Sequence, residues 1–267
     1  MRNISFKSID MKTRITLITI LMIGLFTSYQ TNAQEDERAR EIVKKAHEIT
    51  LGKTSKTTMT MQIIRPEWSR EVSMQSWSMG TDYYLIYIMS PARDKGQVFL
   101  KRENNMWNWI PSIGRMIKIP PSMMMSSWMG SDFNNDELMK ESSLVVDYTH
   151  QFLEEEEIDG MICYQIELTP LPSAPVVWGK VIVWISKEKS FSLKSEFYDE
   201  DGILVNIQNS SKVKRFGDRE LPSYLEIIPV KKEGHKTIMI ITDAEYNVKD
   251  INEKMFSQQM MKRIRPE

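Results

Sequence analysis

The chain has little of the chemistry on which metal centres and disulfide scaffolds depend. It contains one cysteine, Cys163, and three isolated histidines among 267 residues. A single cysteine cannot form an internal disulfide, and it lies too far along the chain to accept an N-terminal lipid. No carboxylate or second histidine accompanies any histidine at metal-ligand spacing. The sequence therefore predicts no metal site, and it predicts that Cys163, between two apolar residues, is buried rather than reactive.

An excess of charge of either sign is also missing. The chain has 35 basic and 36 acidic residues, so it offers no general field for nucleic acid or an anionic membrane. We therefore predict no nucleic-acid partner. The run of glutamates at 154–157 is a local exception that is typical of a solvated edge, and it leads into the hairpin signal Asp159-Gly160.

Catalytic signatures are absent as well. The sequence Leu51-Gly52-Lys53-Thr54 resembles the end of a phosphate-binding loop, but His47 stands where the earlier glycine would have to be. No Gly-x-Ser-x-Gly motif occurs, although a triad assembled from distant residues stays open at this stage. We predict a protein that is not an enzyme and has no cofactor.

Long apolar runs are limited to the N-terminus. Basic residues at positions 7, 12 and 14 precede an apolar stretch at 15–26 and small or polar residues at 27–33. This is the pattern of a secretory signal peptide, because a membrane-spanning helix needs about 20 apolar residues. We expect residues 1–33 to be a signal peptide cleaved after Ala33, or one that starts at Met11, and residues 34–267 to form one domain in a bacterial periplasm.

Three segments have the periodicity or capping residues of helices. Apolar residues recur every three or four positions over 35–51, and Gly52 follows as a stop. Asn134 with Glu137 predicts a capping box for a helix at 135–141, and Asp250 with Glu253 predicts another for a helix at 251–261.

The rest of the chain alternates between apolar and polar residues or is apolar on both faces, as strands are. Turn signals separate the segments at short intervals. Together they predict one antiparallel meander that curves into a partial barrel, with a mostly β fold and flanking helices. The predicted strands cover 59–63, 72–75, 83–89, 98–101, 106–110, 116–119, 151–158, 161–169, 180–186, 192–198, 204–213, 224–229 and 236–248.

The most distinctive segment is the methionine-rich run at 119–133. Prolines at 120 and 121 and a glycine at 130 prevent a regular helix or strand. Flexible thioethers beside aromatic rings adapt to apolar partners of different shapes. A lid over a lipid site and a loop folded over its own core are equally compatible with these residues. The predicted lid residues are Met123, Met124, Met125, Trp128, Met129 and Phe133.

Several sequence blocks together resemble the outer-membrane lipoprotein-sorting family, which is related to the LolA and LolB carriers. The blocks are spread from residue 80 to residue 223, and the resemblance covers most of the mature chain. They are Gly80-Thr81-Asp82-Tyr83-Tyr84-Leu85-Ile86-Tyr87-Ile88, Pro91-Ala92-Arg93-Asp94-Lys95-Gly96, Trp107-Asn108-Trp109-Ile110-Pro111, Lys118-Ile119-Pro120-Pro121-Ser122-Met123, Ser127-Trp128-Met129-Gly130-Ser131-Asp132-Phe133, Leu171-Pro172-Ser173-Ala174-Pro175-Val176-Val177-Trp178-Gly179-Lys180 and Leu221-Pro222-Ser223.

The resemblance implies a curved half-barrel whose mouth is covered by helices and a loop and which encloses an apolar cavity. In the family, such a cavity shelters the acyl chains of a lipoprotein that crosses the periplasm. It also implies an inner-membrane release transporter and an outer-membrane acceptor as partners. The predicted cavity lining is Met59, Met61, Met74, Tyr84, Ile86, Ile88, Trp107 and Trp109, although for any single one of them ordinary core packing is the favoured interpretation.

Arg93, in a turn between a proline and a glycine, is a candidate for contact with a lid carboxylate or a lipid headgroup, and a plain solvated turn is the alternative. We therefore expect a periplasmic carrier or chaperone that moves lipoproteins toward the outer membrane. The competing hypotheses are a sensor module that detects lipid or envelope stress without delivery and, more weakly, a lipid-modifying enzyme.

Overall fold

The computed structural model describes residues 37–139, 143–172, 174, 176–266 of the chain. The predicted signal peptide at 1–33 and the last two residues of the predicted helix at 135–141 lie outside these residues. No helix in the described ranges is both long and apolar enough to cross a membrane.

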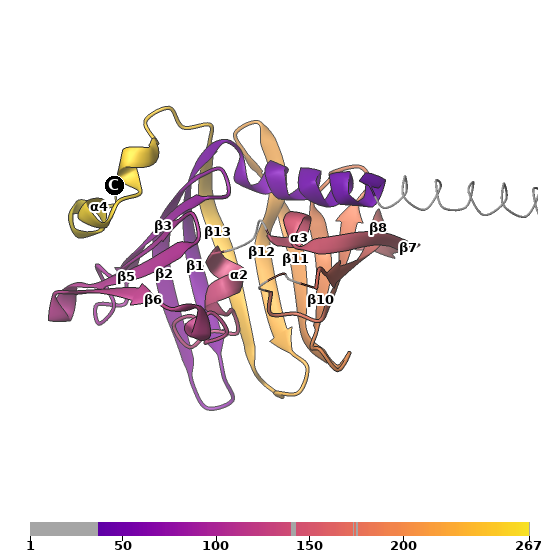
Figure 1. Cartoon of the computed structure of the whole chain (residues 1–267), viewed down its shortest axis with the longest axis horizontal. Coiled ribbons are helices and arrows are strands. Elements are labelled where there is room, and N and C mark those ends of the chain that lie inside the picture. Colours follow the sequence, from indigo (N-terminus) through magenta and orange to yellow (C-terminus); the bar gives the residue numbers. More distant parts are fainter. Residues whose placement is uncertain (1–36, 140–142, 173, 175, 267) are drawn as a thin grey trace, which may run out of the picture.

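One antiparallel sheet of 13 strands forms the body of the protein, as the sequence predicts. The strand order is β6-β5-β4-β3-β2-β1-β13-β12-β11-β10-β9-β8-β7, and the sheet curls without closing (Figure 1). The last strand pairs with the first, so the two halves of the meander join at the centre of the sheet. The strands are β1 Thr54–Ile64, β2 Ser69–Met79, β3 Tyr83–Ser90, β4 Val98–Arg102, β5 Asn105–Ile110, β6 Arg115–Ile119, β7 Tyr148–Ile158, β8 Met161–Pro170, β9 Lys180–Ser186, β10 Ser192–Tyr198, β11 Leu204–Phe216, β12 Arg219–Pro229 and β13 Lys236–Tyr246.

The turns that the sequence predicts are present. Asp159 and Gly160 join β7 to β8, and both have positive φ, 50° and 77°. Two such residues in succession are what a tight hairpin with the twist of its strands requires, and Asp-Gly supplies them at little steric cost.

The N-terminal helix is confirmed over the described residues 37–51. Gly52 ends it with a φ of 67°, and its N–H donates to the carbonyl of Glu48 at 2.9 Å. The apolar stripe of the helix, formed by Ala39, Val43 and Ala46, packs against apolar side chains of β8, β9 and β10. The helix therefore covers one half of the sheet (Figure 1).

Several short helices connect or follow the strands. In addition to the long helix at 37–51, the short helices are η1 Pro111–Ile113, η2 Pro121–Met123, α2 Asn135–Met139, α3 Ser143–Val146, η3 Glu253–Met255 and α4 Gln258–Arg263. The capping box before α2 is confirmed, but the predicted single helix at 251–261 is wrong. Asn252 caps η3 and Ser257 caps α4, because each side chain accepts a backbone N–H of the following turn. Two closely spaced caps divide the segment into two short helices.

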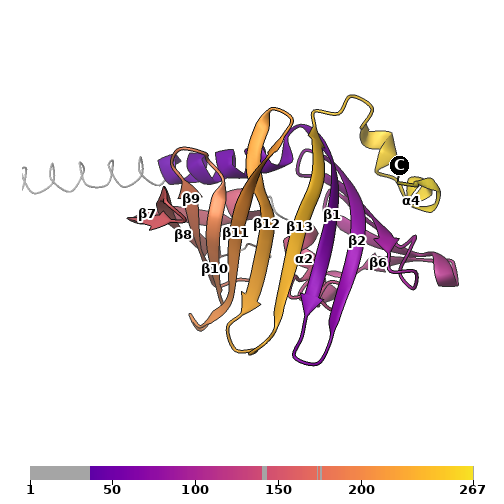
Figure 2. The same cartoon turned by 180° about the vertical axis from the view of Figure 1, so that it is seen from behind.

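Strands β2 to β4 have buried residues on both faces. In β3, Ile86 and Ile88 face one apolar cluster, whereas Leu85 and Tyr87 face another. The second cluster includes residues of the C-terminal segment, which packs on this outer face beside α4 (Figures 1 and 2). Successive side chains of a strand point to opposite faces. The first cluster therefore lies on the face opposite to the C-terminal segment, which is the inner, concave face of the curled sheet. That face carries the candidate site.

Candidate functional site

The concave face of the first half of the sheet is rich in methionine. Five buried methionines come from β1, β2, β5 and β13 and lie among branched aliphatic and aromatic side chains. We call this set the concave cluster. Its buried members are Met59, Met61, Ile63, Val72, Met74, Ile86, Ile88, Phe99, Met106, Trp128, Phe133, Ile227 and Met239.

The methionine-rich loop lies on this cluster. Trp128 and Phe133 are buried in it, and the Trp128 ring packs against Phe99 with centroids 5.1 Å apart. Met124 and Met129 pack against it with partial exposure. The loop therefore covers the concave face with its own apolar side chains, and it turns Met123 and Met125 outward, 45% and 60% exposed.

Two of the six predicted lid residues, Met123 and Met125, thus do not contact the concave cluster, whereas the other four do. Six of the eight predicted lining residues also come together there. These are Met59, Met61, Met74, Ile86 and Ile88 as buried members and Tyr84 at the edge.

Trp107 and Trp109 are placed elsewhere. Both pack against the apolar cluster on the outer face of the sheet, which we call the outer cluster and which includes Leu85, Tyr87 and residues of the C-terminal segment. The two tryptophans therefore lie on the face of β5 opposite to Met106. The ammonium group of Lys262, in α4, lies 5.2 Å from the centre of the Trp109 ring. Sequence alternation in β5 fixes that 107 and 109 share a face, but not which face is concave.

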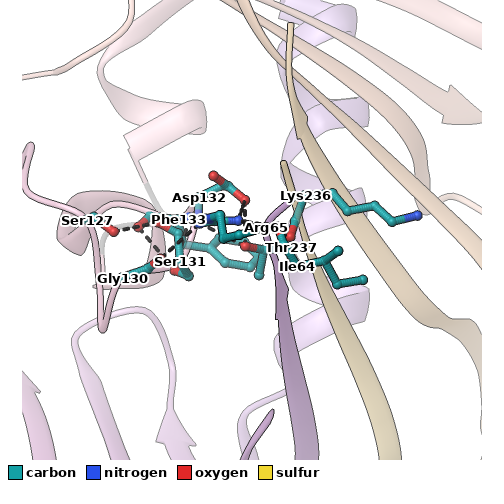
Figure 3. A network of polar contacts seen from close by, with 9 residues as sticks. All are labelled: Ile64, Arg65, Ser127, Gly130, Ser131, Asp132, Phe133, Lys236 and Thr237. Atoms are coloured by element: carbon teal, nitrogen blue, oxygen red, sulfur yellow. Dashed lines mark hydrogen bonds and ion pairs between the residues drawn. The ribbon is translucent and has the colours of Figure 1, made fainter. Parts of the chain in front are cut away.

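A buried ion pair attaches the loop to the sheet (Figure 3). The Arg65 guanidinium, just after β1, donates to the Asp132 carboxylate at 3.0 Å, and the two side chains are only 9% and 5% exposed. Arg65 also donates to the backbone carbonyl of Gly130 at 2.9 Å. Asp132 accepts from the hydroxyl of Thr237, in β13, at 2.7 Å. One loop carboxylate is thereby held by both central strands.

A second group of contacts holds the loop from β2. Arg70 donates to the Asp94 carboxylate and, at 3.4 Å, to the backbone carbonyl of Met129. Asp94 is buried and accepts a further hydrogen bond from Gln97 at 3.0 Å. The Arg93 side chain is 85% exposed, and among the described residues its ion pair is with its neighbour Asp94, at 3.9 Å. The arginines that hold the loop are thus Arg65 and Arg70, which the sequence alone does not single out.

The loop is also ordered internally. Ser127 and Asn134 form a β-bridge, and the backbone N–H of Trp128 donates to the carbonyl of Phe133 at 2.8 Å. The capping box continues this order into α2, because Asn134 Oδ1 accepts from the N–H of Glu137 at 2.7 Å and the Glu137 carboxylate accepts from the N–H of Asn134 at 2.8 Å. The loop is therefore a folded unit with its own hydrogen bonds.

Two polar groups, one in the loop and one in the following helix α2, are in unusual environments. Burial raises the pKa of the Glu137 carboxyl to about 7, although the hydrogen bond from Asn134 opposes the shift. The indole N–H of Trp128 is buried without a hydrogen-bond partner among the described residues. An unpaired buried donor costs about 1–3 kcal/mol. The unpaired indole N–H therefore lowers the free energy needed to lift the loop from the sheet.

A pocket of about 550 Å³ opens beside the loop. Its walls come from the loop, from the end of β12 and the β12–β13 hairpin, from the start of β11 and from Trp178. Arg65, Asp132 and Phe133 line it, so the pocket adjoins the ion pair that holds the loop. Within the described part of the chain, no group of three or more His, Cys, Asp or Glu residues could hold a metal ion.

Three solved structures share this architecture. A DUF1329 family protein from Desulfovibrio piger superposes with a TM-score of 0.78 at 20% identity, over 85% of this chain and 99% of that one. A "putative outer membrane lipoprotein-sorting protein domain" from Vibrio parahaemolyticus gives 0.75 at 22%, over 85% and 99%. A LolA superfamily protein from Nitrosomonas europaea gives 0.70 at 22%, over 83% and 98%.

These likenesses define the class of the fold. The chain is an open, LolA-like half-barrel, and the resemblance predicted from its sequence blocks is confirmed at the level of the fold. A family model described as "Uncharacterized protein" matches residues 80–263, and the chain belongs to that family. No curated protein matches the sequence.

Proposed function

We propose that the protein is a periplasmic carrier that binds acyl chains on the concave cluster, beneath the methionine-rich loop. The observation that carries the proposal is the way the loop covers this surface. Met124, Trp128, Met129 and Phe133 contact the cluster through apolar side chains, while a few polar contacts at the margin hold the loop in place. Acyl methylenes can replace such contacts with little loss of shape complementarity, because thioethers repack readily.

The energies are of the right size for such an exchange. Burial of an acyl chain contributes about 0.8 kcal/mol per methylene, so one long chain contributes on the order of 10 kcal/mol before ordering costs. Displacement of Trp128 and Phe133 costs about 3–5 kcal/mol for each aromatic side chain removed from a core. The gain and the cost are comparable, and binding is therefore expected to be reversible, as a carrier requires.

The cargo of the proposed carrier is a lipoprotein or another acylated lipid. The signal-like N-terminus and the LolA-like fold support an exported protein that receives cargo from an inner-membrane release transporter and passes it to an outer-membrane acceptor. Function then needs no catalytic group, only an apolar surface that opens and closes.

The first test is whether the protein carries lipid. Protein exported by a bacterial host and released by osmotic shock is extracted with organic solvent, and the extract is analysed by mass spectrometry. We expect near-stoichiometric acyl lipid and saturable binding of a fluorescent fatty acid by the delipidated protein. Absence of both bound lipid and saturable binding would remove the carrier from consideration. A pulldown enriched in lipoproteins favours delivery over sensing of free lipid.

A further inference from the structure

The pocket beside the loop has an excess of positive charge. Three of its lining residues are cationic at neutral pH, Arg65, Lys231 and Lys232, and one, Asp132, is anionic. The carboxylate of Asp132 is already paired with Arg65. Lys231 and Lys232, in the β12–β13 hairpin, are exposed, and neither has an ion-pair partner among the described residues. Two ammonium groups at the mouth are thus available to an anion.

Deeper in the pocket, a polar side chain lacks a partner. Asn206, at the start of β11, is 7% exposed, lines the pocket, and makes no side-chain hydrogen bond with the described residues. Because the residue lines the pocket, water or a ligand there can supply the hydrogen bonds that its amide lacks. Asn206 therefore offers both a donor and an acceptor to a bound polar group.

The rest of the lining is mixed, since Ser127, Ser131, Asn134 and His235 are polar, but part of it is apolar and continuous with the concave cluster. Phe133 belongs to both the pocket and the cluster, and Trp178, Val205 and Met125 complete the apolar lining. A cationic mouth, an amide inside that is open to a ligand and an apolar wall that leads under the loop match the shape of an amphiphile with an anionic end.

We propose that this pocket binds the anionic headgroup of a diacyl lipid whose chains lie on the concave cluster. The proposal rests on the proposed acyl-chain carrier and narrows its cargo. A phosphodiester can accept charge-assisted hydrogen bonds from the ammonium groups of Lys231 and Lys232, whereas a diacylglyceryl group without a charged headgroup cannot. The cargo class is therefore an anionic phospholipid, bound in preference to a neutral lipid with the same chains.

The test compares two lipids with identical chains, one of them pyrene-labelled phosphatidylglycerol and the other pyrene-labelled diacylglycerol. Binding is measured for the wild type, for K231Q/K232Q and for the control K45Q/K249Q. The control removes two exposed lysines, one in the helix at 37–51 and one beyond the opposite end of β13. We expect the wild type to prefer phosphatidylglycerol about fivefold to tenfold at low salt. K231Q/K232Q loses this preference without losing diacylglycerol binding, and the control keeps it.

The possible failures are distinct. Equal binding of both lipids by the wild type contradicts the headgroup site and leaves the carrier intact, whereas no binding of either lipid contradicts the carrier itself. A preference that both double variants lose equally reflects net charge rather than this pocket and also contradicts the site. Finally, binding of inorganic phosphate is measured at constant ionic strength for the same variants. If it binds in a Lys231- and Lys232-dependent way while the lipids are not distinguished, the pocket is a free-anion site and not a headgroup site.

Discussion

Arg65 and Asp132 form a buried ion pair that joins the end of β1 to the methionine-rich loop. Both side chains are more than nine-tenths buried, and Thr237 supplies a second hydrogen bond to the same carboxylate. Breaking a buried pair costs more free energy than breaking a surface pair, because removal of one partner leaves the other charge buried and uncompensated. Together with the contacts of Arg70, this buried pair holds the loop, and a substitution at Asp132 removes it.

Asp132→Asn is expected to release the loop. The amide retains the size of the side chain but leaves the Arg65 charge unpaired, at a cost of about 3–5 kcal/mol. Amide hydrogen exchange over 124–134 should become faster by orders of magnitude, while exchange in β8 and β9 changes little. The matched control is Glu253→Gln, which breaks the exposed pair with Arg102 and should cost at most about 1 kcal/mol. Unchanged exchange in the loop of D132N would show that the pair does not hold it.

Met124→Glu is expected to weaken acyl binding without unfolding the protein. The side chain packs against the concave cluster from the loop, so a carboxylate there meets apolar side chains in the closed state and acyl chains in the bound state. Affinity for a fluorescent fatty acid should fall by orders of magnitude while Tm shifts little, because a loop can swing out where a strand cannot. Met123→Glu, at an exposed position, is the control and should leave binding unchanged. Collapse of the fold in M124E would assign the loop to the permanent core.

Stability should depend on pH through Glu137. Burial raises the pKa of its carboxyl from 4.5 to about 7 in the folded protein, so the folded state retains this proton where the unfolded state has released it. The contribution of the proton is fully present below about pH 4.5 and is lost as the pH rises through about 7; linkage puts its size at about 3 kcal/mol. Between pH 5 and 8, the free energy of unfolding of the wild type should fall relative to that of Glu137→Gln. Parallel pH profiles of the two proteins would exclude this assignment.

Cys163 should react slowly in the native protein. The thiol is fully buried in β8, and its Sγ donates to the carbonyl of Met161 at 3.4 Å. Burial also raises its pKa, which reduces the thiolate fraction that reacts. Labelling with a maleimide should be slow in buffer and rapid in denaturant, and Cys163→Ser provides the blank. Fast labelling under native conditions would mean that β8 opens readily.

The sequence is sufficient to predict the sheet, because each strand has its own period and each turn its own residues. The alternation at Met59, Met61 and Ile63 and the Asp-Gly turn at 159–160 depend only on local chemistry. The pairing of β13 with β1 is a long-range contact that no local pattern encodes. The same holds for the outer cluster, where the C-terminal segment covers Trp107 and Trp109.

The contacts that hold the candidate lid could not be predicted for a related reason. Arg65 and Asp132 are 67 residues apart, and nothing near either residue marks it as half of a buried pair. Likewise, the sequence around Lys231 and Lys232 indicates only a lysine-containing hairpin. Their position beside the loop follows from the fold. A basic residue near Pro66 and an acidic residue between Ser131 and Phe133 are the only local signals, and both also fit a solvated turn.

Photolabelling tests the central claim most directly. A palmitate analogue with a diazirine near the end of its chain is bound to delipidated protein, irradiated, and located by peptide mass spectrometry. The account predicts saturable labelling in β1, β2 and β3 and in the loop at 124–133, competed by unlabelled palmitate and lost in M124E. Labelling confined to the outer face around Trp107 and Trp109, or labelling that unlabelled palmitate does not reduce, would contradict an acyl site beneath the loop.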